Sequence, residues 1–148
     1  MATVTSDKYR PERSANLATF PGPVNVPMFA STTAYVGQML VSVGGYGKHP
    51  DAANAMTGTM RGVVVDGAIE STGVNGGATA VCKPGVYRFK NHGTNPAAAT
   101  NVPCVVYASD GETVSIDSAD GPPAGTLIGF DANDPQGCPC EVVLKCFL

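Results

Sequence analysis

Glycine and proline interrupt this chain so often that they leave no room for a long regular helix. The 148 residues include 18 Gly and 12 Pro, two residue types that break regular elements and form turns. Short β-branched and apolar runs stand between them, at residues 34–43, 60–69 and 101–109. Strands separated by turns every 8–12 residues or so are typical of barrels and sandwiches. The sequence therefore predicts an all-β fold, a small single-domain β-barrel or β-sandwich, with a jelly-roll-like topology as one option.

Local patterns predict further strands and turns. Residues 78–90 read as two strands around Pro84-Gly85, and Asp110-Gly111 is typical of a hairpin turn, because glycine accepts a positive φ. The alternation in the last run predicts that Val142 and Leu144 face a core. Early proline and several alanines favour one or two helical turns over residues 49–56. The remaining expected strands are residues 112–116, 125–131 and 140–147.

The first 27 residues differ from the rest of the chain. Isolated large residues stand between polar ones, and prolines at positions 11, 21, 23 and 27 favour extended backbone. Such a segment cannot bury a continuous apolar face by itself. We therefore divide the chain into an extended N-terminal arm, residues 1–27, and a β domain, residues 28–148. The alternative for the first segment is a disordered tail, although spaced aromatic residues favour an arm that lies over another subunit.

Composition narrows the classes of partner. Only 14% of the residues are charged, which suggests that partners cover part of the surface. The net charge of −3 and the scattered basic residues disfavour nucleic-acid binding. The sequence has neither the apolar core of a signal peptide nor an apolar run long enough to span a membrane. The five cysteines are an odd number without a signal, which predicts reduced thiols and folding in a cytosol.

Candidate chemical motifs are weak. Cys138 and Cys140 are one residue apart, and with Cys146 they lack the second ligand pair of a structural zinc site. The acidic run at residues 131–137 lacks the glycine and glutamate that a calcium loop needs, so it reads as an ordinary turn. His49 and His92 stand in predicted loops and read as solvated surface histidines.

Catalytic motifs are also missing. No nucleophile motif of the G-x-S-x-G kind is present, and residues 71–80 are glycine-rich without the lysine of a phosphate loop. The chain resembles nucleotide pyrophosphatases of the dUTPase kind in size and strand content, but their Gly- and Asp-bearing motifs have no counterpart here. The sequence therefore predicts no enzyme activity, no metal and no cofactor.

Two stretches resemble the head decoration, or cement, proteins of tailed bacteriophages. They are "GVVVDGAI" at residues 62–69 and "VYASDGETVSIDSADGPPAGTLIGFD" at residues 106–131, followed by "CEVVLKCFL" at residues 140–148. The segment "DKYRPERSANLATFPGPVNVP" is similar to an arm found in some of these proteins. The resemblance covers half to two-thirds of the chain. The cysteine-rich end departs from the family pattern.

The resemblance implies a structural role without catalysis. Cement proteins bind the outside of the capsid between major capsid subunits and offset the pressure of packaged DNA. It implies the major capsid protein as partner and self-association, with a homotrimer preferred over a homodimer. It also implies location on the virion exterior after synthesis in the bacterial cytoplasm. The candidate contact residues of the arm are Tyr9, Arg10, Arg13, Leu17 and Phe20. The alternative function is a receptor- or glycan-binding module of a tail or fibre, although the chain has no Trp and only 5 Tyr.

Overall fold

The computed structural model describes residues 22–144, and these residues form an all-β fold, as predicted. Two single-turn 3-10 helices, η1 (Ala99–Asn101) and η2 (Ser118–Asp120), are the helical elements of this part of the chain. No helix between residues 22 and 144 is long and apolar enough to cross a membrane. The strands are β1 (Val24–Pro27), β2 (Thr33–Ala34), β3 (Met39–Val43), β4 (Tyr46–Lys48), β5 (Thr59–Asp66), β6 (Ala68–Ile69), β7 (Thr79–Lys83), β8 (Val86–Asn91), β9 (Cys104–Ala108), β10 (Thr113–Ser115), β11 (Pro123–Phe130) and β12 (Cys140–Leu144).

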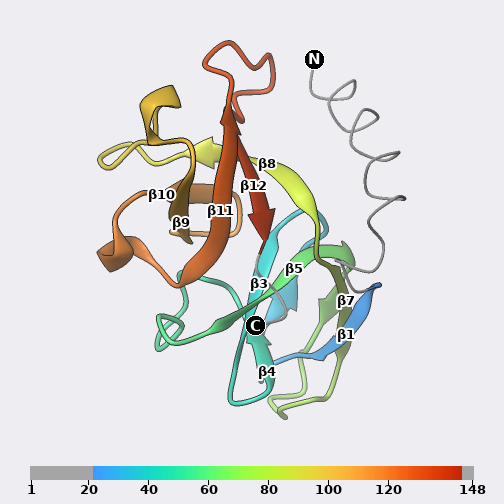
Figure 1. Cartoon of the computed structure of the whole chain (residues 1–148). Helices are drawn as coiled ribbons and strands as arrows, with labels where there is room; N and C mark the ends of the chain where they lie inside the picture. Colours follow the sequence, from blue (N-terminus) through green and yellow to red (C-terminus); the bar gives the residue numbers. More distant parts are fainter. Residues whose placement is uncertain (1–21, 145–148) are drawn as a thin grey trace.

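The N-terminal half forms a five-stranded sheet in the order β1-β7-β5-β3-β4 (Figure 1). The sheet curls, because Met28 after β1 forms a bridge to Gly47 in β4 at the opposite edge. A Cβ atom at Gly47 would lie 2.9 Å from side-chain atoms of Leu40 and Val26, so any larger residue there would force these core side chains to shift. The curled sheet encloses a first core, together with the two-stranded β2–β6 sheet. Its buried members are Val26, Met28, Ala34, Leu40, Val64, Ala80 and Cys82.

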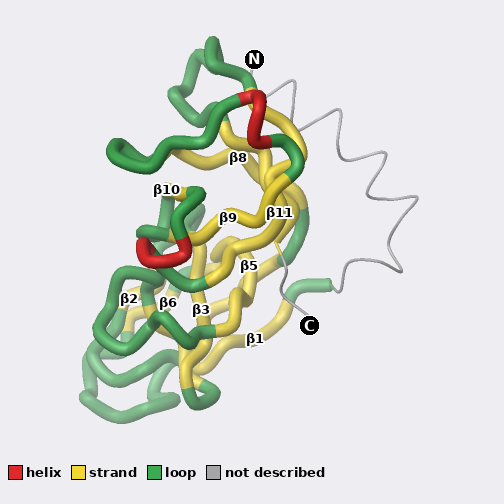
Figure 2. The backbone as a smooth tube through the Cα atoms, turned by 60° about the vertical axis from the view of Figure 1, so that its left-hand side comes forward, coloured by secondary structure: helices red, strands yellow, loops and turns green. Residues whose placement is uncertain are grey.

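The C-terminal half closes into a five-stranded barrel in the order β10-β8-β12-β11-β9. The pairs are antiparallel except β8 and β10, which run parallel. Figure 2 shows the barrel strands β8, β9, β10 and β11 stacked on the part of the molecule that holds β1, β2, β3 and β6. The barrel completes the single small domain predicted from the sequence.

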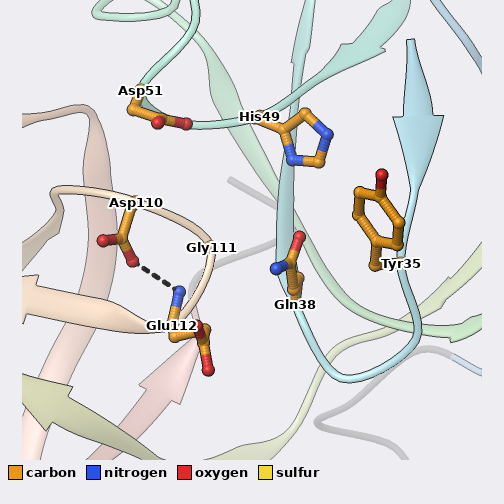
Figure 3. A pocket seen from close by; sticks show the side chains of 7 residues that line it. All are labelled: Tyr35, Gln38, His49, Asp51, Asp110, Gly111 and Glu112. Carbon is orange, nitrogen blue, oxygen red and sulfur yellow. Dashed lines mark hydrogen bonds between the residues drawn. The ribbon is translucent and has the colours of Figure 1, made fainter.

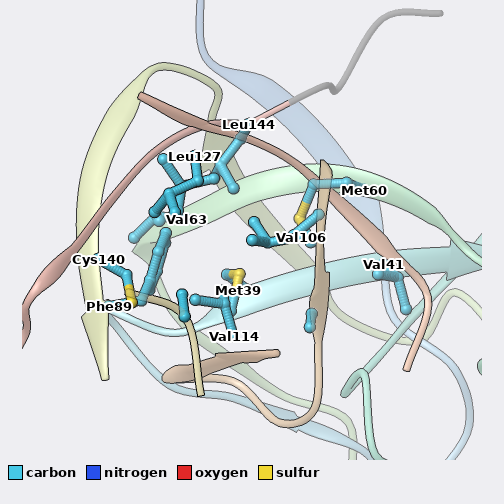
Figure 4. Close-up of a cluster of buried hydrophobic side chains, with 14 of the residues drawn as sticks. Met39, Val41, Met60, Val63, Phe89, Val106, Val114, Leu127, Cys140 and Leu144 are labelled. Atoms are coloured by element: carbon cyan, nitrogen blue, oxygen red, sulfur yellow. The ribbon is translucent and has the colours of Figure 1, made fainter. Parts of the chain in front are cut away.

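Strands β3 and β5 belong to both cores, because their alternate side chains point to opposite faces of the sheet. Met39 and Val63 reach the barrel core, whereas Leu40 and Val64 lie in the first core. Figure 4 shows Met39, Val63 and Met60 beside barrel side chains such as Leu127. A strand buried on both faces reads as a continuous apolar run, which explains the adjacent valines Val63 and Val64. Val65 is 45% exposed and lies where the register between β5 and β7 shifts.

Several predicted boundaries change in the structure. The run at residues 34–43 is two strands, β2 and β3, separated by a turn that contains Gly37 at φ +92°. The short helix predicted at residues 49–56 is wrong. That segment is a chain of turns closed by i to i+3 bonds such as Ala52 N–H to His49 O, 3.0 Å. Asn54 adopts φ +64°, which an α-helix cannot accommodate. The alanine content favoured a helix, but the left-handed residue interrupts it.

The domain boundary also differs from the prediction. Residues 24–27, which the sequence analysis assigned to the arm, form β1 and pair with β7 from Val24–Cys82 to Pro27–Thr79. Residues 1–21 and 145–148 lie outside the described part of the chain. The described β fold therefore starts at Val24 rather than at Met28.

The glycine-rich connection after β6 is organised around a buried carboxylate. Glu70 is 2% exposed, and its oxygens accept hydrogen bonds from the N–H groups of Ser31 (2.9 Å), Thr72 (3.2 Å) and Gly73 (2.9 Å) and from the Thr72 hydroxyl. The Ser31 bond, followed by the Thr72 hydroxyl, lowers the pKa of Glu70 to about 2. These bonds, with the N–H of Gly76 that donates to Met28 O at 2.8 Å, hold residues 70–77 against the loop after β1.

Candidate interaction surfaces

The five candidate contact residues, Tyr9, Arg10, Arg13, Leu17 and Phe20, all lie outside the described residues. Their role as arm contacts therefore stays a prediction. The structure does define where the two undescribed segments join the β domain. Val24, near the first described residue, pairs with Cys82, and the N–H of Leu144, the last described residue, donates to Gly85 O at 3.0 Å. Both ends of the described chain therefore flank the turn between β7 and β8. We call this end of the molecule the terminal face.

A row of β-branched residues crosses the outer wall of the barrel next to this face. The strand registers place Val86 opposite Val143, Val143 opposite Thr126, and Thr126 opposite Val105. The neighbours of these residues along each strand point into the barrel core, so the row itself points outward. Val105 is 46% exposed, and Ile128 beside the row is 41% exposed. We call Val86, Val143, Thr126 and Val105 the wall row.

The adjacent row on the same wall is polar and covered. Arg88 pairs with Glu141 in register, and Arg88 Nη1 lies 3.0 Å from Asp134 Oδ1 on the loop between β11 and β12. Asp134 also accepts the N–H groups of Gln136 (3.1 Å) and Cys138 (3.0 Å). The Cys138 bond is the largest of the causes that lower the pKa of Asp134. The acidic run is therefore a loop pinned to the wall by Arg88, and Glu141 opposite Arg88 is only 8% exposed.

A shallow cleft of about 360 Å³ lies where the first sheet meets the barrel hairpin. Tyr35 and His49 form one side as stacked rings, with centroids 6.0 Å apart and planes at 30°. Figure 3 shows Gln38 between this pair and the turn that carries Asp110 and Glu112. Tyr35 is 57% exposed. An accessible aromatic ring, an amide and carboxylates can together contact sugar hydroxyls or a cationic group.

The residues of this cleft come from segments whose proximity the sequence does not reveal. His49 was expected as a solvated loop residue, but its Nε2 lies 2.6 Å from Thr33 O, which fixes the ring against β2. Gly111 lies in the predicted hairpin turn between β9 and β10, but a positive φ is not the reason that glycine stands there. It has no positive φ, and instead a Cβ there would lie 3.0 Å from the Gln38 side chain.

Ser115, His92 and Asp120 lie close together, but the hydrogen bonds between them differ from those of a catalytic triad. The Ser115 hydroxyl donates to Asp120 Oδ2 at 2.5 Å rather than to histidine, and Ser115 is fully buried. His92 Nδ1 accepts the N–H groups of Thr94 and Asn95, at 3.2 and 3.0 Å. A nucleophilic serine instead donates its proton to the imidazole. The Ser115 bond is the main cause that lowers the pKa of Asp120, and the cluster fastens two loops together.

The cysteines of the described chain are free thiols. Burial is the main cause that raises the pKa of Cys140 to about 11, and the nearby Cys104 and Cys138 contribute to the same shift. Cys146 lies outside the described residues. Within residues 22–144, no group of three or more His, Cys, Asp or Glu side chains is arranged to hold a metal ion.

Comparison with known protein families, with curated proteins and with solved structures finds no match to this chain.

Proposed function

We propose that this protein is a structural decoration protein that binds the outside of a tailed-phage head, between major capsid subunits, and stabilises the shell. The observation that carries the proposal is the terminal face. Val24 and Leu144 both lie beside the turn between β7 and β8, so the segments 1–21 and 145–148 join the domain at one end. A single face can then present both segments to one underlying surface.

Three further features support this role. The resemblance to cement proteins at residues 62–69 and 106–131 falls on β5, β6, β9, β10 and β11, so it concerns the strands that build both cores. The net charge of −3 suits a surface away from the packaged DNA. Repetition over a symmetrical shell makes weak single contacts strong through avidity. Self-association is expected to give a homotrimer in preference to a homodimer. The candidate contacts to the shell are the five arm residues Tyr9, Arg10, Arg13, Leu17 and Phe20.

A co-sedimentation assay tests the proposal. Undecorated expanded heads of a tailed phage are incubated with the full chain and pelleted. We expect the full chain to pellet with the heads, and a chain lacking residues 2–20 to stay in the supernatant while keeping its β-type circular dichroism spectrum. A chain in which Gly and Ser replace residues 2–20 at equal length controls for size. Failure of the full chain to bind the heads would contradict the proposed function.

One observation favours the second candidate function, a glycan- or receptor-binding module. The cleft lined by Tyr35, His49 and Gln38 has an exposed ring and polar groups, which sugar sites commonly combine. A glycan array probed with the full chain and with Tyr35→Ala distinguishes the two functions. Binding that Tyr35→Ala abolishes would favour the glycan function. Absence of binding to the array, with retained binding to heads, would favour decoration.

A further inference from the structure

The cleft between the first sheet and the barrel hairpin is acidic. Three carboxylates line it, those of Asp51, Asp110 and Glu112, and neither lysine nor arginine is among its lining residues. The Asp51 side chain has no hydrogen-bond or ion-pair partner among residues 22–144. Glu112 is paired only weakly, because its Oε1 lies 3.5 Å from Lys90 Nζ and both side chains are more than half exposed. The cleft therefore attracts cations and repels anions.

The opposite side of the cleft is an aromatic pair that the fold holds in place. His49 Nε2 lies 2.6 Å from Thr33 O. Because a carbonyl oxygen can only accept, Nε2 carries the ring proton, and Nδ1 of the neutral ring is an acceptor. Figure 3 shows this second nitrogen on the side of Gln38. Tyr35 stacks on the same ring and stays 57% exposed, so part of its ring is open to a ligand. An exposed aromatic face attracts cations.

Backbone hydrogen bonds join the acidic side of the cleft to the aromatic side. The N–H of Met39 donates to Gly111 O at 2.7 Å, which ties the hairpin turn to the start of β3. Gly111 packs so closely on Gln38 that a Cβ there would lie 3.0 Å from its side chain. Asp110 Oδ1 accepts the N–H of Glu112 at 2.8 Å, and Oδ2 has no partner among the described residues. The two sides are therefore already positioned, which lowers the entropy cost of binding.

A guanidinium group suits this arrangement better than a sugar does. It presents five N–H donors and no acceptor, it lies flat on aromatic rings, and it pairs with carboxylates through two hydrogen bonds. The cleft offers the matching acceptors, namely the carboxylates, His49 Nδ1 and the Gln38 amide oxygen. A neutral sugar would gain nothing from the negative charge, and its own acceptor atoms would find few donors.

The surroundings of the cleft favour a guanidinium that belongs to a protein. Val36 is 67% exposed and follows Tyr35 in the chain. Ile69 is 70% exposed and pairs with Thr33, the residue whose carbonyl holds the His49 ring. Apolar side chains this exposed beside an aromatic ring are typical of protein interfaces, in which Arg and Tyr supply much of the binding energy.

We propose that the cleft binds an arginine side chain of a partner protein. The guanidinium lies against the exposed part of the Tyr35 ring and donates to the carboxylates of Asp51 and Asp110. Apolar residues beside this arginine in the partner contact Val36 and Ile69. The inference goes beyond the proposed function and does not depend on it, because it rests on the cleft and not on the terminal face.

Titration of the ¹⁵N-labelled full chain with short peptides tests the site by NMR. The probe is the blocked tripeptide acetyl-Gly-Arg-Gly-amide, and its control replaces arginine by citrulline, which has nearly the same shape and no charge. We expect the arginine peptide to shift the amides of Tyr35, Gln38, His49 and Gly111 with a saturable, millimolar dissociation constant. The citrulline peptide should shift none of them.

Substitutions of single charges give a matched comparison. Asp51→Asn and Asp110→Asn should each raise the dissociation constant of the arginine peptide about threefold, and the double variant should raise it about tenfold. Tyr35→Leu should raise it about threefold. Asp117→Asn is the control, because Asp117 Oδ1 accepts the N–H of Ala119 at 2.9 Å in a turn like that of Asp110, and Asp117 does not line the cleft. It should leave the dissociation constant unchanged.

Three results would overturn the proposal. The first is equal shifts with the arginine and citrulline peptides, and the second is an arginine affinity that the cleft variants change no more than Asp117→Asn does. The third is saturable binding of a neutral methyl glycoside at the same amides without binding of the arginine peptide, which would assign the cleft to sugars. None of these results bears on whether heads bind the protein, so this inference and the proposed function fail separately.

Discussion

Replacing Leu127 by Ala tests the assignment of the inner and outer faces of β11. Leu127 is fully buried in the barrel core, and the next residue, Ile128, is 41% exposed on the outer wall. Each substitution to alanine removes three carbon atoms, so the pair is chemically matched. At about 0.8 kcal/mol per buried carbon, Leu127→Ala loses about 2.4 kcal/mol of transfer free energy. The cavity left behind brings the loss of unfolding free energy to about 3.5 kcal/mol.

Ile128→Ala is expected to cost less for two reasons. Only about three-fifths of its surface is hidden, so the transfer term falls to about 1.4 kcal/mol. Solvent also replaces the missing atoms on an open wall, so no closed cavity forms. The two variants should therefore differ by about 2 kcal/mol in unfolding free energy.

Urea unfolding followed by circular dichroism measures this difference. With a slope of about 2 kcal/mol per molar urea, the midpoint falls by about 1.7 M for Leu127→Ala and by about 0.7 M for Ile128→Ala. Equal midpoints, or a larger fall for Ile128→Ala, would refute the assignment of the two faces.

Three further predictions concern polar and thiol groups. The carboxylate of Glu70 has its pKa lowered from 4.5 to about 2, so it stabilises the folded state above pH 4.5 and this stabilisation is lost as pH falls towards 2. Glu70→Gln should therefore be less stable than the native chain at pH 7 and show a flatter fall in an acid titration of the urea midpoint. Burial raises the pKa of both Cys82 and Cys140 to about 11. At pH 8 iodoacetamide should modify half-buried Cys138 before either of them, as mass spectrometry of tryptic peptides would show. Asp134→Ala should cost about 2 kcal/mol in urea unfolding and speed proteolysis of the 131–139 loop. The substitution removes the carboxylate that lies 3.0 Å from Arg88 on β8, and it leaves the N–H groups of Gln136 and Cys138 without their acceptor.

Much of the β pattern follows from the sequence alone. The turn at Pro84-Gly85 separates β7 from β8 as expected, and Val142 and Leu144 face the barrel core as their alternation predicts. These features depend on residues close together in the chain, where turn preferences and alternation act directly.

The strand order, the two cores and the candidate cleft depend on contacts between segments that are distant in the sequence. No local signal reveals that β8 pairs in parallel with β10 or that β3 and β5 serve two cores. The buried Glu70 was equally hidden, because its donors Ser31 and Gly73 stand far from one another in sequence. The Tyr35–His49 stack arises in the same way, from a turn and a loop that only the folded sheet brings together.

Cryo-electron microscopy of phage heads incubated with the full chain tests the central claim most directly. The account predicts additional density on the outer surface of the shell, between major capsid subunits, into which the domain fits with the turn between β7 and β8 towards the shell. Heads that carry no added density, or a domain oriented with that turn away from the shell, would contradict it.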